Sequence, residues 1–86
     1  MATSLGSFID SLKKAAAEVD VSSSVDVRTL RELFEVAIEN SLERVRSESV
    51  DSFLFGPWVI SDFILLAESE GYSLKDASAF LSEIFD

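Results

Sequence analysis

The chain has 86 residues, of which 48% are hydrophobic and 27% charged, a composition typical of one compact domain and unlike that of a disordered chain. It contains no cysteine and no histidine, which excludes disulfides, thiolate metal sites and catalysis that depends on either side chain. Sixteen acidic residues against seven basic ones give a net charge of −9, which repels nucleic acids and anionic membranes and attracts basic partners.

Two helices are predicted in the first half of the chain. Apolar residues spaced three and four apart predict one helix over residues 4–19 and a second, the longest, from Val27 to about residues 47–49. The stretch between them is rich in serine and aspartate, whose side chains compete for backbone hydrogen bonds. We therefore expect a loop over residues 20–26.

The third segment contains the Gly56-Pro57 pair inside an apolar run. Proline cannot continue a helix from the preceding turn, but it suits the first position of a new helix. We expect a short helical turn over residues 50–55, followed by a helix over residues 57–70. Because this helix is apolar around most of its circumference, it must be covered on several sides.

The chain is predicted to end in a further helix. Gly71, which adopts the left-handed conformation easily, is expected to end the preceding helix. Ser73 stands three residues before Asp76, a variant of the capping box that predicts a helix start at this point. No segment alternates as a half-buried strand does. The sequence thus predicts a single all-α domain over residues 1–86, a compact bundle of four main helices with a short helical turn before Gly56-Pro57.

One local pattern carries a family resemblance. Between residues 66 and 81 an alanine is followed four residues later by a turn glycine, then by an apolar residue, a serine and a second helix. These positions are held by Ala67, Gly71, Tyr72, Ser73, Ala77 and Phe80. The pattern resembles the helix-turn-helix of bacterial repressors of the lactose-repressor type, which implies a second helix lying in the major groove. That helix has Lys75 as its one base and no Arg, Asn or Gln, so we expect a helix pair with a tight glycine turn.

Carboxylates dominate the remaining polar positions. Four of them stack at three- and four-residue spacings on the second helix, opposite its apolar stripe: Glu32, Glu35, Glu39 and Glu43. We interpret them as a solvated face or as a docking stripe for a basic partner. Asp62 is the acid deepest in an apolar segment, and we expect it on the polar side of its helix or paired with an arginine of the second helix; a buried carboxyl group is the alternative.

No catalytic constellation is present, because no spacing assembles a nucleophile, a base and an oxyanion site. No calcium-loop pattern appears either, so we expect a non-enzymatic protein without a metal or another cofactor. The apolar run over residues 53–67 is shorter than the roughly 20 residues that span a bilayer, and no secretory signal is visible. We therefore expect a cytoplasmic location.

The aromatic segment indicates how the protein functions. Residues 53–71 hold four of the nine aromatic side chains. If Phe55, Trp58 and Val59 point away from the apolar stripe of their helix, they leave a surface patch of the kind that marks an interface. The residues predicted to bind a partner are Phe53, Phe55, Trp58, Val59, Glu32, Glu35, Glu39 and Glu43.

We predict an acidic helical protein–protein interaction module, an adaptor, regulatory or assembly subunit. It is expected to self-associate as a homodimer or to bind a partner protein, for which its acidic faces favour a basic one, through the segment Phe53–Val59. The alternative is an acidic DNA-mimic inhibitor of a nucleic-acid-binding protein. A helix-turn-helix regulator is less favoured, and neither nucleic acid nor membrane is an expected partner.

Overall fold

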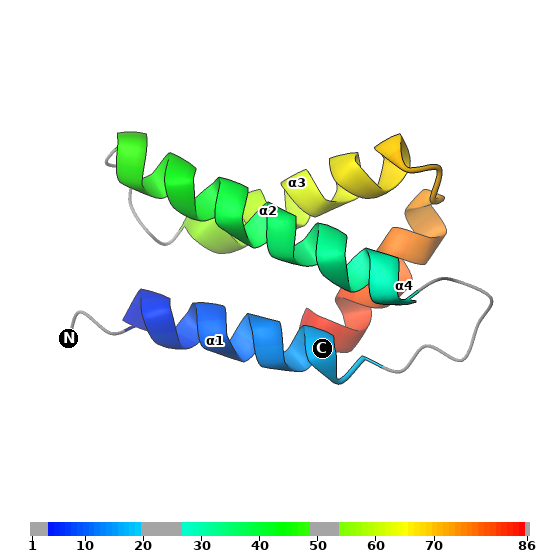
Figure 1. Cartoon of the computed structure of the whole chain (residues 1–86), viewed down its shortest axis with the longest axis horizontal. Helices are drawn as coiled ribbons and strands as arrows, with labels where there is room; N and C mark the ends of the chain where they lie inside the picture. The colour runs from blue at the N-terminus through cyan, green and yellow to red at the C-terminus, as the bar shows by residue number, and fades with distance from the viewer. Residues whose placement is uncertain (1–3, 20–26, 49–53, 86) are drawn as a thin grey trace.

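The structure, a computed structural model, describes residues 4–19, 27–48 and 54–85. Within these ranges the chain forms four helices and no strand (Figure 1). They are α1 (Ser4–Ala17), α2 (Val27–Glu48), α3 (Phe55–Ser69) and α4 (Leu74–Phe85). The predicted all-α bundle is confirmed.

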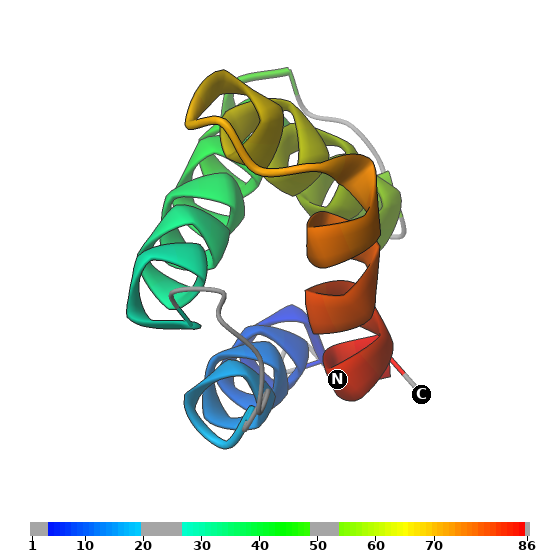
Figure 2. The same cartoon turned by 90° about the vertical axis from the view of Figure 1, so that its right-hand side faces the viewer.

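The α2–α3 pair forms the framework of the fold. α2 and α3 run in opposite directions and make the most extensive contact between any two of the described helices. α4 packs on α3 and is inclined steeply to the pair, and α1 packs on α2 and α4 (Figure 2). The α2–α3 pair thus has an inner side covered by α1 and α4 and an outer side that those two helices do not cover.

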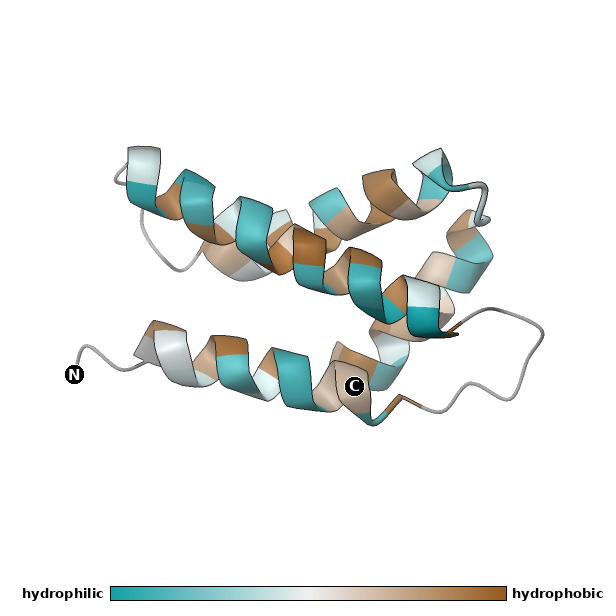
Figure 3. Ribbon diagram, viewed as in Figure 1, coloured by the Kyte–Doolittle hydropathy of each residue, from teal (hydrophilic) through white to brown (hydrophobic). Residues whose placement is uncertain are grey.

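The core is apolar and built around phenylalanine rings. Phe34 of α2 lies edge-on to Phe63 of α3 and Phe80 of α4, with ring centroids 5.6 Å and 5.8 Å apart. Phe63 and Phe80 stack on each other at 5.2 Å. Aromatic pairs of this kind stabilise a core by more than the burial of their apolar area alone would do. Hydrophobic positions on α1 lie along the side that faces α2, as the three-and-four spacing predicts (Figure 3).

The start of α3 differs from the prediction. The helix begins at Phe55, so Pro57 occupies its third position and not its first. Proline is tolerated there because the first N–H groups of a helix have no intrahelical acceptor. Leu54 is in 3₁₀ conformation directly before the helix, and the rest of the predicted turn, residues 50–53, lies outside the described residues.

The turn between α3 and α4 is the one predicted. Gly71 has a φ of +93°, the left-handed region. The amide of Gly71 donates to the carbonyl of Glu68 at 3.0 Å and that of Tyr72 to the carbonyl of Ala67 at 2.9 Å, the two hydrogen bonds of a Schellman motif. The Asp76 amide donates to Oγ of Ser73 at 3.1 Å, which confirms the cap.

Polar contacts join α1 to α2. The Arg31 guanidinium donates from Nε to the Ala16 carbonyl at 2.8 Å and from Nη2 to the Val19 carbonyl at 2.6 Å. The Ala16 carbonyl belongs to the last turn of α1 and also accepts from the Val19 amide at 3.3 Å, and Val19 lies two residues beyond the helix. Lys13 and Glu39 form an exposed ion pair at 3.8 Å. Arg31 therefore caps the end of α1. On its own helix, α2, it also lies one turn before Glu35.

Candidate functional site

The aromatic segment is mostly interior. Phe55 and Val59 are fully buried, because a helix that begins at Phe55 places both on the same side as Phe63. The prediction that Phe55 and Val59 form part of an exposed apolar patch is therefore wrong. Trp58 lies on the other side of the helix and is only partly buried. Phe53 lies outside the described residues.

Exposed large apolar side chains occur on all four described helices, and two of them belong to the α2–α3 pair. Val36 of α2 is 44% exposed and Leu65 of α3 is 62% exposed. Because the helices are antiparallel, one helical turn along α2 corresponds to one turn back along α3. We call this surface the α2–α3 face and define it by Val36, Asn40, Arg44, Trp58, Asp62 and Leu65.

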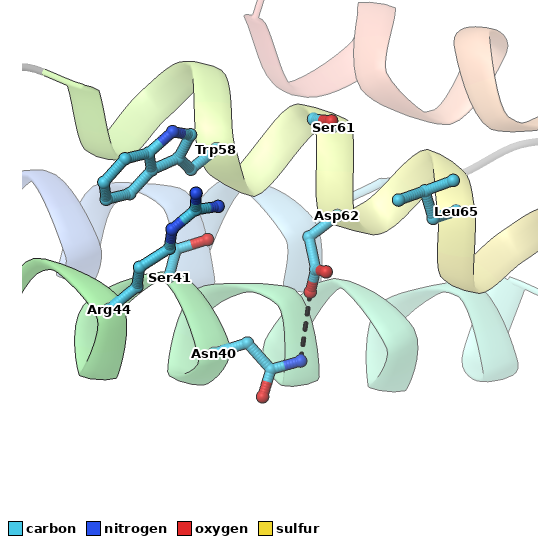
Figure 4. A pocket seen from close by; sticks show the side chains of 7 residues that line it. All are labelled: Asn40, Ser41, Arg44, Trp58, Ser61, Asp62 and Leu65. Carbon is cyan, nitrogen blue, oxygen red and sulfur yellow. Dashed lines mark hydrogen bonds between the residues drawn. The ribbon is translucent and has the colours of Figure 1, made fainter.

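Two cross-helix contacts fix the positions of the two helices along this face. The Arg44 guanidinium lies 4.2 Å from the centroid of the Trp58 ring, a cation–π contact. One turn away, Nδ2 of Asn40 donates to Oδ2 of Asp62 at 3.0 Å (Figure 4). By the same antiparallel correspondence, Val36 and Leu65 fall on the next level. The face thus carries a stacked cation, then a polar pair, and then two exposed apolar side chains, Val36 and Leu65.

A hollow of about 130 Å³ opens on the α2–α3 face. Its lining comes from both helices and consists of Asn40, Ser41, Arg44, Trp58, Ser61, Asp62 and Leu65 (Figure 4). Pockets for drug-sized ligands occupy roughly 300–1,000 Å³, so this hollow is too small for one. It matches a single side chain in size.

Asp62 confirms one expectation of the sequence. It is half-buried on the side of α3 that faces the outer part of α2, and it accepts a hydrogen bond from Asn40. The buried-carboxyl alternative does not hold. The residue on α2 that donates to it in this bond is an amide, whereas an arginine of α2 was one of the two possibilities expected from the sequence.

Carboxylates surround the face at both ends. Glu32 lies one turn before Val36 on α2, and Glu68 lies about one turn after Leu65 on α3, so both are at the apolar end. Glu43 lies beside Arg44 at the other end, and all three glutamates are exposed. Helix α3 contains no lysine or arginine. A field of negative charge therefore borders the apolar centre.

The predicted glutamate stripe lies on the solvent side of α2. Glu32, Glu35, Glu39 and Glu43 are all exposed. Glu39 is paired with Lys13 of α1. A second hollow, of about 250 Å³, opens beside the end of this stripe and is lined by Glu39, Leu42, Glu43, Arg46 and Ser47.

Two features are absent from the described part of the chain. Across residues 4–19, 27–48 and 54–85, no three acidic side chains come together in a group that could hold a metal ion. None of the helices in these ranges combines the length and apolar character needed to cross a bilayer. What the geometry provides is a surface with an apolar centre, a hollow and an acidic border.

Val36 and Leu65 were not among the predicted site residues. A signal was present for Val36, a large apolar residue that falls off the buried stripe of α2, but not for Leu65, because α3 is apolar around most of its circumference. Asn40 and Arg44 gave no comparable signal, since only the pairing of α2 with α3 brings them to Asp62 and Trp58. Comparisons with protein families, characterised proteins and solved structures found no match for this chain.

Proposed function

We propose that the protein is a non-enzymatic interaction module whose recognition surface is the α2–α3 face. The observation that carries the proposal is the exposure of Leu65 and Val36 beside Trp58 and a hollow of side-chain size. Tryptophan and arginine are enriched among the residues that dominate binding energy, and both stand at this hollow. An adaptor, regulatory or assembly subunit acting in the cytoplasm is the role that fits such a surface best.

The rigidity of the surface supports this role. Every residue of the face lies on α2 or α3, and these two helices share the most extensive contact of the fold. A partner that binds there meets side chains already held in place, which lowers the entropy lost on association.

Charge favours a different protein over a second copy as the partner. Two copies that met through this face would bring Glu32, Glu43 and Glu68 of each close to those of the other. Like charges brought together at an interface oppose association and steer the choice of partner. The proposed complex is therefore heteromeric, and self-association through the buried Phe55 and Val59 has no surface to act through.

A DNA-mimic inhibitor is the second candidate. It draws support from the exposure of Glu32, Glu35, Glu39 and Glu43 along one helix. Such binding would weaken steeply as salt rises and would not depend on Leu65, whereas docking on the α2–α3 face would depend on Leu65 at any salt concentration. Measuring the affinity of wild type and Leu65→Ser for a partner at about 50 and 300 mM salt separates the two.

Site-specific crosslinking tests the proposal. A photoreactive residue at position 65, introduced in the cells that produce the protein, should give one discrete protein adduct. The same residue at position 74, where Leu74 is 55% exposed on α4, is the control. The purified partner should then bind Leu65→Ser about tenfold more weakly than wild type. Equal adducts at both positions, or equal affinity for Leu65→Ser, would contradict the proposal.

A further inference from the structure

The inference concerns the kind of partner, and it rests on the proposed function. We infer that the α2–α3 face binds a basic amphipathic helix, which inserts one apolar side chain into the hollow and places lysines or arginines against the acidic border. The elements that carry this inference are the size of the hollow, the order of residues along the face and the distribution of charge.

The hollow selects one apolar side chain. Its volume of about 130 Å³ accommodates one side chain of the size of leucine or methionine and no more. Trp58 and Leu65 stand on either side of it, and the aliphatic stem of Arg44 leads to the guanidinium that covers the Trp58 ring. The rest of the lining is polar and comes from Asn40, Ser41, Ser61 and Asp62, so an inserted side chain makes its apolar contacts with Trp58, Leu65 and the stem of Arg44.

The order of residues along the face selects a helix. Val36 lies four residues before Asn40, which lines the hollow, so the two are separated by about 6 Å along α2. Residues three or four apart on a helix have this separation and share one side. A partner helix can therefore place one apolar residue in the hollow, against Trp58 and Leu65, and the next against Val36, which is the helix-in-groove mode of recognition.

The charge distribution selects a basic helix. Glu32 and Glu68 flank the apolar end, and Glu43 flanks the end at Trp58. Arg44 is the base of this face, and its guanidinium is stacked on Trp58. Lysines or arginines beside the apolar stripe of the partner would meet carboxylates at both ends, whereas an acidic helix would be repelled.

The probe is a synthetic peptide of about five helical turns, composed of leucine and lysine, with leucines spaced three and four apart. Titration of the full chain, followed by Trp58 fluorescence and by calorimetry, should show saturable binding with one peptide per chain. A peptide with the same composition but permuted leucines should bind at least about tenfold more weakly, because it lacks a stripe to place on the face. A leucine–glutamate peptide with the original spacing should not bind.

Matched variants locate the binding site. Val36→Ser with Leu65→Ser should weaken peptide binding about tenfold, whereas Leu74→Ser should leave it unchanged. Glu32→Gln, Glu43→Gln and Glu68→Gln together should weaken it by a similar factor. The control makes the same change in net charge at exposed residues away from the face. It consists of Asp10→Asn, Glu18→Gln and Glu83→Gln, and it should alter the affinity less than about threefold.

Several results would overturn the inference. They are no binding of the striped basic peptide, equal binding of the permuted or acidic peptide, or equal losses from the two sets of charge variants. The proposed function fails on a different result, the absence of a specific adduct at position 65. If that adduct forms and its partner contacts Leu65 through an acidic or non-helical segment, the proposed function stands and this inference alone is overturned.

Discussion

Helices α1 and α3 both pack on α2, but different forces hold them there. α3 is joined to α2 mainly by fully buried apolar side chains, with Phe63 against Phe34 at the centre. α1 buries a narrower stripe and adds polar contacts, the Arg31 cap on its last carbonyls and the Lys13–Glu39 pair. Apolar packing therefore fixes the α2–α3 pair, on which the proposed site lies, whereas polar groups help to position α1.

The largest change in stability is expected at the α2–α3 interface. Phe63→Ala removes a ring that packs on both Phe34 and Phe80 and should lower the free energy of unfolding by about 3–5 kcal/mol. This is a large part of the total for a domain, roughly 5–15 kcal/mol. Chemical denaturation followed by circular dichroism measures it. A loss below about 1 kcal/mol, no greater than that of the exposed control Leu74→Ala, would show that the ring is not central to the core.

The polar attachment of α1 should give the next largest effect. Arg31→Ala removes two charge-assisted hydrogen bonds to the carbonyls of Ala16 and Val19 and should cost about 2 kcal/mol. Hydrogen exchange should accelerate most in α1 and less in α3. Lys75→Ala, at an exposed position on α4, is the control and should change stability little. Uniform acceleration across all helices would contradict a local role for Arg31.

Two glycines should respond in opposite directions. Gly71→Ala places a Cβ at a φ of +93° and should destabilise by about 1 kcal/mol. Gly56 lies in the first turn of α3, where a Cβ would sit 3.7 Å from Cζ of Phe8, an ordinary contact. Gly56→Ala should therefore stabilise by about 0.5 kcal/mol. Thermal unfolding of the two variants side by side decides this, and a change of the same sign in both would refute it.

The smallest effect is expected from the exposed ion pair. Lys13→Ala should cost below about 1 kcal/mol, because exposed pairs are well solvated. The loss should shrink further as salt rises from about 50 to 500 mM. If the loss of stability in Lys13→Ala equals that in Arg31→Ala, or does not depend on salt, then Lys13 holds α1 through a contact that is stronger than the exposed ion pair at 3.8 Å.

Much of the fold could be predicted from local sequence signals. The three-and-four spacing located the helices, and Gly71 with Ser73 located the turn before α4, because these residues act through their own backbone. The start of α3 was harder to predict from the sequence, since proline is compatible with any position in the first turn of a helix and not only with the first position. That shift of two residues matters because it puts Phe55 into the same helix as Phe63, on the buried side.

The site was harder to predict than the fold. α3 is apolar around most of its circumference, so periodicity alone could not show that Leu65 is exposed and Val59 buried. The Arg44–Trp58 and Asn40–Asp62 contacts join residues 14 and 22 positions apart and exist only once α2 and α3 are aligned. The net charge of −9 correctly indicated an acidic border, but not the apolar centre that it surrounds.

The most direct test of the account compares stability and binding in one variant, Val36→Ser with Leu65→Ser. Both side chains are exposed, so the free energy of unfolding should stay within about 0.5 kcal/mol of wild type. The affinity for the striped leucine–lysine peptide should fall about tenfold, because the apolar centre of the face is lost. Unchanged affinity in a stably folded variant would contradict the claim that the α2–α3 face is a recognition surface.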